Sequence, residues 1–308
     1  MIKIKNFMFF LISILVILMI VINFDTLSSR FKDILRIHPE LVIKPGNEYQ
    51  KDDSFLFVKQ VDSYTPYNYE ELKNIFYSVL NQGWNEFTFY CPVEYQECLN
   101  DVADISYDKL LLSNINNFVH PYNSYTSIKT LFDETGEITI KVTHLYSNEE
   151  IDRIDKDIDL LIENVVKDSM SDKEKILALH DYIINNTKYD IERANSETNS
   201  SEYDSARILG VLYDHYAICS GYADLMAVIL EKLNIPNYKI SSETHVWNAL
   251  YLDNEWWHLD LTWDDPISTS GKDILDHSYF LIDSKTLREL DAGIKDHIYD
   301  KDIYMEVN

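Results

Sequence analysis

The stretch ICSGYADLMAVILEKL occupies residues 218–233, and its apolar side chains recur three and four positions apart. This spacing predicts an amphipathic helix, which Asn234 and Pro236 end. Cys219 is therefore expected in the first turn of the helix. There the helix macrodipole and the unpaired N–H groups stabilise a thiolate, and the same N–H groups can donate to a developing oxyanion. The alternative for Cys219 is a buried, unreactive thiol.

A β-hairpin is predicted further along the chain, over residues 245–262. Asp253 and Asn254 form a dipeptide typical of the two-residue turn between antiparallel strands. Side chains two positions apart share one face of a strand. Closing the hairpin around this turn makes His245 and Asp260 diagonal neighbours on one face, within side-chain reach. A slip of one residue would place them on opposite faces.

Cys219, His245 and Asp260 supply the groups that a thiol nucleophile needs. The histidine serves as base and acid, and the carboxylate orients the histidine ring. His258 falls on the same face of the hairpin and is a second candidate for the base. His180 and Asp181 lie in another predicted helix, where we expect them to be packed and hydrogen-bonded without a catalytic or metal-binding role. The chemistry of the three residues requires no metal ion.

Segments around these residues resemble the signatures of the transglutaminase-like superfamily, in the order and spacing of its bacterial members. The three signatures are CSGYA at 219–223, HVWN at 245–248 and DLTWDDP at 260–266. Two further segments resemble the helix before the site and the strand after it. They are residues 175–190, which include His180-Asp181-Tyr182, and HSYFL at 277–281. The resemblance covers residues 148–283, and it is specific for fold and triad but not for substrate.

The resemblance implies an α+β fold with a papain-like core, in which the helix that bears the cysteine packs on an antiparallel sheet. It assigns the nucleophile to Cys219, the general base and acid to His245, and the orienting acid to Asp260. The implied reaction is cysteine-dependent acyl transfer on protein or peptide amides, by hydrolysis or by transfer to an amine, without a cofactor. Four residues are candidates for the substrate-binding groove, with core packing as the alternative: Gly221, Tyr222, Trp247 and Trp263. The rival function is a non-catalytic surface module that binds or scaffolds and keeps this fold.

The N-terminus has the pattern of a membrane anchor. Lys3 and Lys5 precede an apolar run at residues 7–24. As a helix this run reaches about 27 Å, close to the ~30 Å thickness of the hydrocarbon core. The basic flank favours a cytoplasmic N-terminus, so we expect a single-pass membrane protein whose body lies outside the cytoplasmic membrane. The alternative is a signal peptide that is cleaved to release a secreted protein.

The composition indicates a folded protein with an acidic surface. The 308 residues are 46% hydrophobic, and 27 Lys and Arg stand against 52 Asp and Glu, for a net charge of −25. Phosphate binding needs a basic surface, so no nucleic-acid partner is expected. Four parts are expected along the chain: an anchor at 1–24, a stalk at 25–50, a small α/β module at 51–147 and the transglutaminase-like domain at 148–308.

Cys91 and Cys98 lie close together in the small module. An oxidising compartment permits a disulfide between them, while two free thiols or a metal-binding pair are the alternatives. Pairing them would leave Cys219 as the odd thiol, which is what a nucleophile requires.

Local patterns predict the remaining elements. In the small module, strands are expected at Phe55–Val58, Phe87–Tyr90 and Gly136–Tyr146, and a helix at Tyr69–Asn81. Further along, helices are expected at 148–167 and, from a capping box that begins at Ser171, to Asn186. Residues 191–204 are expected to form an exposed loop.

Overall fold

The computed structural model describes residues 41–133, 135–196, 203–266 and 274–308, together with residues 17, 19 and 21. The predicted anchor at 7–24 therefore lies almost entirely outside the described residues, as does the predicted stalk up to residue 40. Across the ranges given above, no helix combines the length and the apolar character that a bilayer crossing needs.

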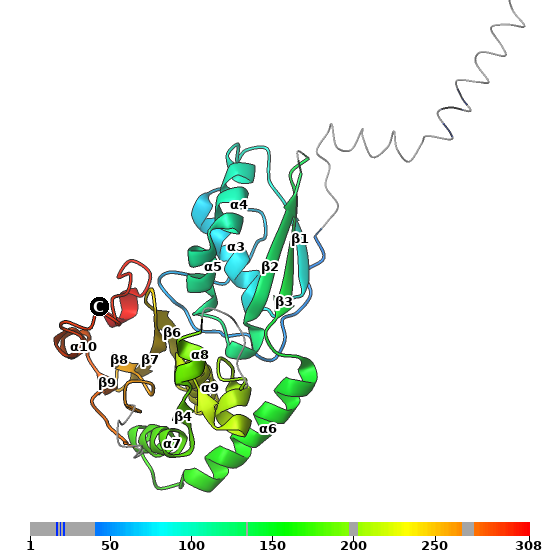
Figure 1. Cartoon of the computed structure of the whole chain (residues 1–308). Coiled ribbons are helices and arrows are strands. Elements are labelled where there is room, and N and C mark those ends of the chain that lie inside the picture. The colour runs from blue at the N-terminus through cyan, green and yellow to red at the C-terminus, as the bar shows by residue number, and fades with distance from the viewer. Residues whose placement is uncertain are drawn as a thin grey trace, which may run out of the picture.

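The first part of the chain forms a three-stranded antiparallel sheet beside a layer of helices (Figure 1). The strands in spatial order are β1 (Glu86–Tyr90), β3 (Glu137–His144) and β2 (Tyr125–Phe132). The helices are α3 (Tyr69–Asn81), α4 (Cys98–Tyr107), α5 (Lys109–Asn116) and the 3-10 turn η1 (Pro121–Asn123). The alternation predicted near residue 140 is observed in β3, where Ile138, Ile140 and Val142 are buried.

The elements of this part differ from the sequence prediction in two ways, one strand that does not form and three elements that are unexpected. The expected strand at Phe55–Val58 does not form, because Phe55 instead packs against the rings of Phe118 and Tyr238. Its apolar pattern therefore reflects tertiary packing and not membership of a sheet. The sequence does not predict helices α4 and α5 or strand β2. Cys98, the first residue of α4, forms a disulfide with Cys91.

The second part of the chain packs a helix on a four-stranded antiparallel sheet. The strands in spatial order are β6 (Asn237–Ser241), β7 (Val246–Leu252), β8 (Glu255–Leu259) and β9 (Phe280–Ile282). The helix is α9 (Cys219–Lys232), within one residue of the predicted bounds at each end. Lys239 on β6 forms a 2.5 Å ion pair with Asp224 on α9, and Asn248 on β7 donates to the carbonyl of Ala223. The cysteine-bearing helix thus lies on an antiparallel sheet, as predicted.

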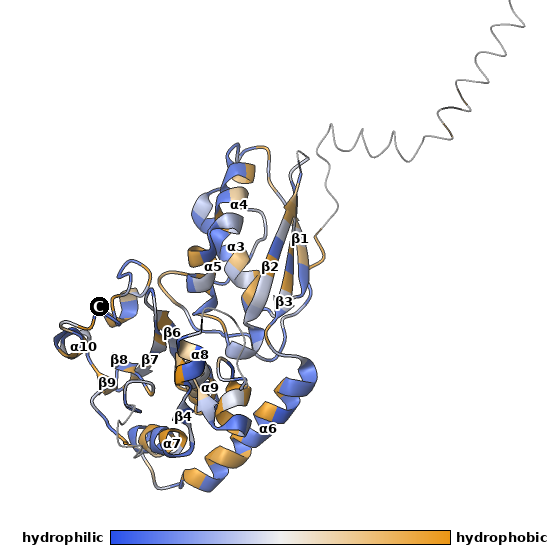
Figure 2. Ribbon diagram, in the orientation of Figure 1, coloured by the Kyte–Doolittle hydropathy of each residue, from blue (hydrophilic) through white to orange (hydrophobic). Residues whose placement is uncertain are grey.

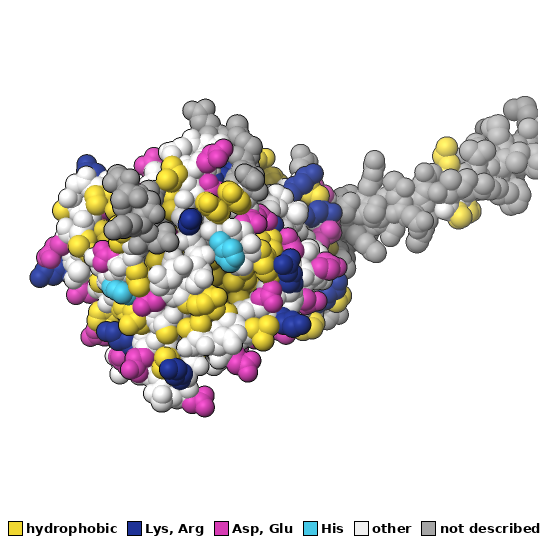
Figure 3. Space-filling view, turned by 60° about the horizontal axis from the view of Figure 1, so that its bottom comes forward, with side chains coloured by type: hydrophobic (Ala, Val, Ile, Leu, Met, Phe, Trp, Pro, Cys, Tyr) yellow, Lys and Arg dark blue, Asp and Glu magenta, His cyan; other side chains and the backbone are white. Residues whose placement is uncertain are grey.

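Two amphipathic helices lead to this core, and each begins with a capping box. The first is α6 (Asn148–Val165), capped by Ser147, and the second is α7 (Asp172–Asn186), capped by Ser171. Figure 2 shows apolar and polar residues alternating along α6. On the surface, apolar side chains gather between charged ones on the face that carries α6 and α7 (Figure 3).

The remaining elements are short. They are β4 (Lys188–Tyr189), α8 (Ile191–Ala194), the π-helical turn η2 (Gly210–Asp214), β5 (Tyr216–Ala217), α10 (Ser284–Leu290) and η3 (Met305–Val307). β4 and β5 pair in parallel, and β5 leads directly into the start of α9. The predicted loop at 191–204 contains α8, and its residues 197–202 lie outside the described residues.

The two parts of the chain share a hydrophobic core. Tyr238, Ile240 and Trp247, on one side of β6 and β7, belong to the same buried cluster as Phe118 of the first part. The other side of the sheet presents Leu250 to a second cluster that contains the buried face of α9. The four-stranded sheet therefore lies between α9 and the first part of the chain, and a continuous core crosses the expected boundary after residue 147.

Candidate active site

Cys219 is the first residue of α9, and the neighbouring backbone holds it in place. Ser220 donates through its hydroxyl to the carbonyl of Ala206 at 2.9 Å. A side chain at Gly221 would place its Cβ 2.5 Å from the carbonyl oxygen of Ser205, so only glycine fits there. Cys219 is half-buried and carries a free thiol. The nucleophile candidate is therefore partly accessible, at the positive end of a helix.

The predicted hairpin register is confirmed along the strands. Asp253 and Asn254 have φ of 53° and 67°, the left-handed conformations that a two-residue turn requires. The strand pairs run from Leu252 opposite Glu255 to Asn248 opposite Leu259. His245 and Asp260 lie just beyond the paired residues, at the open end of the hairpin.

His245 and Asp260 meet at this end of the hairpin. The Nε2 atom of His245 lies 2.5 Å from Oδ2 of Asp260, and both side chains are almost fully buried. The other carboxylate oxygen of Asp260 accepts from the backbone N–H groups of Thr262 and Trp263, at 2.8 and 3.2 Å. The turn that follows β8 therefore fixes the carboxylate, and the carboxylate in turn orients the imidazole.

The charges of this site favour an ionised His245. Burial alone would lower the pKa of His245, but the Asp260 carboxylate and the nearby Cys219 thiol raise it from 6.5 to about 10. Burial would conversely raise the pKa of Asp260, but the attraction of His245 and hydrogen bonds from His245 and His297 hold it well below its ordinary value of 3.8. An imidazolium in this place can give its proton to a leaving group.

His297 is a member of this cluster that sequence reasoning missed. Its Nε2 atom lies 2.9 Å from Oδ2 of Asp260, and its Nδ1 atom lies 3.1 Å from Oδ1 of Asp291. The ring is buried and stacks on Tyr279. Asp260 thus has one oxygen shared between two imidazoles. His297 lies in an irregular segment after α10, outside any periodic pattern, so no local signal could have found it.

Tyr189 on β4 is a second residue that the sequence did not indicate. Burial, followed by the charges of Cys219, Asp296 and Asp260, raises the pKa of Tyr189 to about 12. Its phenol therefore stays protonated near the thiol at neutral pH. The short parallel pairing of β4 with β5 brings it there, because β5 leads directly into Cys219.

Three of the four groove candidates lie beneath the surface. Tyr222 and Trp247 are each 1% exposed, and Gly221 is buried. Tyr222 donates its hydroxyl to Asp265 at 2.6 Å, and Trp247 stacks on the ring of His245. These three residues pack beneath the site, so the alternative of core packing applies to them and not the role of groove wall. Trp263 is partly exposed and borders the cluster through its ring contact with His297.

His258 is committed to a structural role. Its Nδ1 atom accepts from the indole N–H of Trp247 at 3.0 Å, and its Nε2 atom lies 2.9 Å from the hydroxyl of Ser284. Burial lowers the pKa of His258 to about 3. With both nitrogens occupied and the ring neutral, His258 is not placed to act as the base.

Comparison with known proteins gives the family of this region. Residues 160–261 match the family model of the transglutaminase-like superfamily. The chain contains a transglutaminase-like domain. The matched segment includes Cys219, His245 and Asp260, whereas His297 lies beyond it.

Individual relatives are distant. The chain is 24% identical over 144 residues to kyphoscoliosis peptidase from Homo sapiens; the match covers 40% of this chain and 21% of that protein. The chain thus spans about a fifth of the length of this curated relative. A TGase crystal structure is similar at 20% identity and a TM-score of 0.35, over 47% of each chain. A cysteine-protease candidate from Cytophaga hutchinsonii is similar at 15% identity and a TM-score of 0.27, over 48% of this chain and 65% of that one.

Proposed function

We propose that this protein catalyses cysteine-dependent acyl transfer on protein or peptide amides, with Cys219, His245 and Asp260 as the catalytic residues. The observation that carries the proposal is a partly accessible thiol at a helix start, beside an imidazole that a buried carboxylate orients at 2.5 Å. The transglutaminase-like domain supports cysteine-dependent acyl transfer or hydrolysis in general.

The proposed reaction proceeds in two steps. The Cys219 thiolate attacks the amide carbonyl carbon, and N–H groups at the start of α9 stabilise the oxyanion. The C–N bond breaks as His245 gives its proton to the leaving amine or ammonia, which leaves a thioester on Cys219. Water or a second amine then attacks the thioester, His245 takes a proton from it, and the C–S bond breaks to release an acid or a new amide. Asp260 stays ionised and holds the ring in place.

The test is a screen of the full-length protein in detergent against peptides that contain glutamine and internal amide bonds. Mass spectrometry would monitor ammonia loss, chain cleavage and incorporation of an added amine. We expect one of these products from the wild type and none from Cys219→Ala, which removes only a small thiol from the packing. If both proteins give the same products, or iodoacetamide fails to alkylate Cys219 at mildly acidic pH, the non-catalytic binding module is the better assignment.

The proposal includes a location outside the cytoplasmic membrane, with residues 7–24 as the anchor. Lys3 and Lys5 before the apolar run support this orientation, and a Cys91–Cys98 disulfide suits an oxidising compartment. Protease added to intact cells should digest the body while the N-terminal segment stays in the membrane fraction. A body fully protected until the cells are lysed would contradict this topology.

A further inference from the structure

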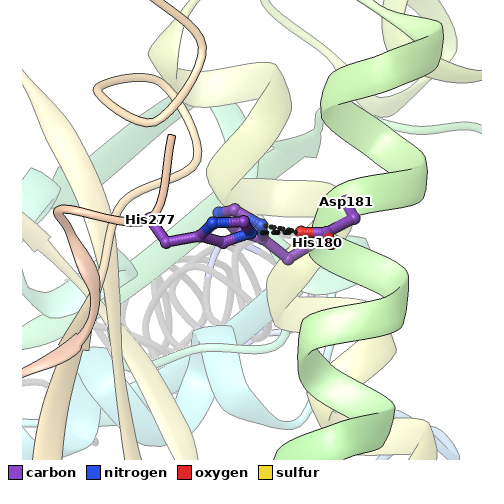
Figure 4. A group of neighbouring side chains, drawn as sticks. All are labelled: His180, Asp181 and His277. Atoms are coloured by element: carbon purple, nitrogen blue, oxygen red, sulfur yellow. Dashed lines mark hydrogen bonds and ion pairs between the residues drawn. The ribbon is translucent and has the colours of Figure 1, made fainter. Parts of the chain in front are cut away.

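A second cluster of metal-ligating side chains lies outside the candidate active site. His180 and Asp181 come from α7, and His277 comes from the segment before β9 (Figure 4). The Oδ1 atom of Asp181 lies 2.9 Å from Nδ1 of His180 and 2.8 Å from Nε2 of His277. One ligand atom from each residue lies within 4.8 Å of the other two. Segments almost a hundred residues apart in the chain thus direct three donor atoms at one point.

The hydrogen bonding of His180 leaves a place for a cation at this point. Its Nε2 atom lies 3.1 Å from Oδ2 of Asp264, and both side chains are fully buried. A neutral imidazole has a single N–H group. With that proton on Nε2, directed at Asp264, the lone pair of Nδ1 faces the carboxylate of Asp181, which is also an acceptor. A proton or a metal ion between Nδ1 and Asp181 removes this conflict.

The same contact supplies the outer support that metal-binding histidines usually have. A histidine that binds a metal commonly donates its other N–H group to a carboxylate, which fixes the ring and its tautomer. Asp264 is the carboxylate that faces Nε2 of His180. Its other oxygen, Oδ1, accepts from the backbone N–H of Tyr279 at 2.9 Å, which holds the carboxylate in place. His180 is therefore oriented with Nδ1 toward Asp181 before any ion binds.

The distances and exposure suit a small divalent ion. Zinc bonds to nitrogen and oxygen of about 2.0–2.2 Å place tetrahedral ligands roughly 3.3–3.5 Å apart, so Oδ1 of Asp181 needs to move away from each imidazole nitrogen by only about half an ångström. The side chains of Asp181 and His277 are 32% and 44% exposed, which leaves a coordination position open to water. Two imidazoles and one carboxylate favour zinc or a similar transition metal over calcium or magnesium, which prefer all-oxygen sites.

We propose that His180, Asp181 and His277 form a binding site for a divalent transition-metal ion, with Asp264 as the residue that orients His180. The ion would link α7 to the segment before β9. It would also tether the turn that carries Asp260, because the backbone N–H of Asp264 donates to the carbonyl of Asp260 at 3.2 Å. The site is structural, and it does not depend on the proposed acyl transfer.

The test uses full-length protein in detergent, purified without a histidine tag and stripped with a chelator. Titration calorimetry with Zn²⁺ should show one site of micromolar or tighter affinity, and Co²⁺ should give the visible absorption of a tetrahedral nitrogen and oxygen site. Zn²⁺ should also raise the unfolding temperature, since it binds only the folded chain. His277→Ala should abolish all three signals while it unfolds like metal-free wild type, because this ring is exposed.

His144→Ala is the matched control, since it removes a half-buried imidazole in β3 and should bind zinc like the wild type. Asp264→Asn should weaken binding by about 10–100-fold, the usual effect of losing a carboxylate behind a histidine ligand. Wild type that binds zinc no more tightly than His277→Ala, or that binds none, would overturn the proposal. Equal loss of binding in His144→Ala would do the same, because it would show non-specific adsorption.

Discussion

At the scale of single residues, Asp260 organises the candidate active site. Two imidazoles approach one of its oxygens, and two backbone N–H groups donate to the other. The sequence predicts the contact with His245, because both residues fall on one face of the hairpin. It does not predict His297, because a single histidine in an irregular segment carries no pattern that locates it in space. The alternation of side chains along the hairpin thus predicts one of the two imidazoles beside Asp260. The tertiary fold brings the other one there.

The raised pKa of His245 predicts how stability depends on pH. The folded-state pKa of about 10 lies above the ordinary value of 6.5. Protonated His245 therefore contributes stability that is complete below pH 6.5 and is lost as pH rises toward about 10. Urea unfolding of wild type and His245→Gln across this range should give a free-energy difference that shrinks with rising pH. The slope should be smaller in an Asp260→Asn background, and a flat difference in the wild-type background would contradict the charged pair.

His297 should act as a positioning residue. We expect His297→Gln to lower kcat of the proposed reaction by up to about 100-fold with little change in KM, because a poorly oriented carboxylate misplaces the His245 ring. Asp291→Asn, which removes the charge from the other partner of His297, should have a milder effect of the same kind.

A readout that needs no substrate separates orientation from general stability. The rate of Cys219 alkylation by iodoacetamide, measured against pH, should change in His297→Gln and remain unchanged in a stability-matched variant such as Leu250→Val. An unchanged alkylation profile in His297→Gln would show that His297 is only a packing residue.

At the scale of elements, the sequence predicts those whose signals are local. α6 and α7 follow from their capping boxes and apolar stripes, α9 from its spacing, and the hairpin from its turn dipeptide. The prediction fails where an apolar run has no such local signal. Phe55–Val58 looks like a strand, yet its burial comes from aromatic rings far along the chain. The spacing of apolar residues indicates that a residue is buried, but it does not indicate which part of the chain covers it.

The turn of the hairpin offers a test of how one element sets the site. Asn254 has φ of 67°, a conformation that β-branched residues adopt only with strain. Asn254→Val should therefore destabilise the fold by about 1–2 kcal/mol and reduce activity, because the turn sets the register that aligns His245 with Asp260. Asn254→Gly, which accepts this φ freely, should be close to wild type on both counts. Chemical denaturation and turnover assays measure the two effects, and equal stability of the two variants would contradict the argument.

At the scale of the whole molecule, the shared core joins regions that the sequence presents as separate. Composition and motifs predict a small module and a transglutaminase-like domain, and the family match falls within the second. The buried cluster nevertheless runs from Phe118 of the first part to Tyr238, Ile240 and Trp247 on the four-stranded sheet. Tyr238 packs directly on Phe55 and Phe118, so the first part of the chain covers the β6 side of this face of the sheet.

A truncation at the expected domain boundary should therefore fail to fold. A fragment of residues 148–308 would expose the part of the sheet that packs on the first part of the chain, including Tyr238, which Phe55 and Phe118 cover. Large exposed apolar patches promote aggregation. This fragment should elute as aggregate in gel filtration and show no cooperative thermal transition. A fragment of residues 41–308 keeps the whole described core and should be monodisperse, with a single cooperative transition and full alkylation of Cys219. Should the 148–308 fragment unfold cooperatively and alkylate at the same rate, the first part of the chain would be a separable module, and the active-site geometry would not depend on it.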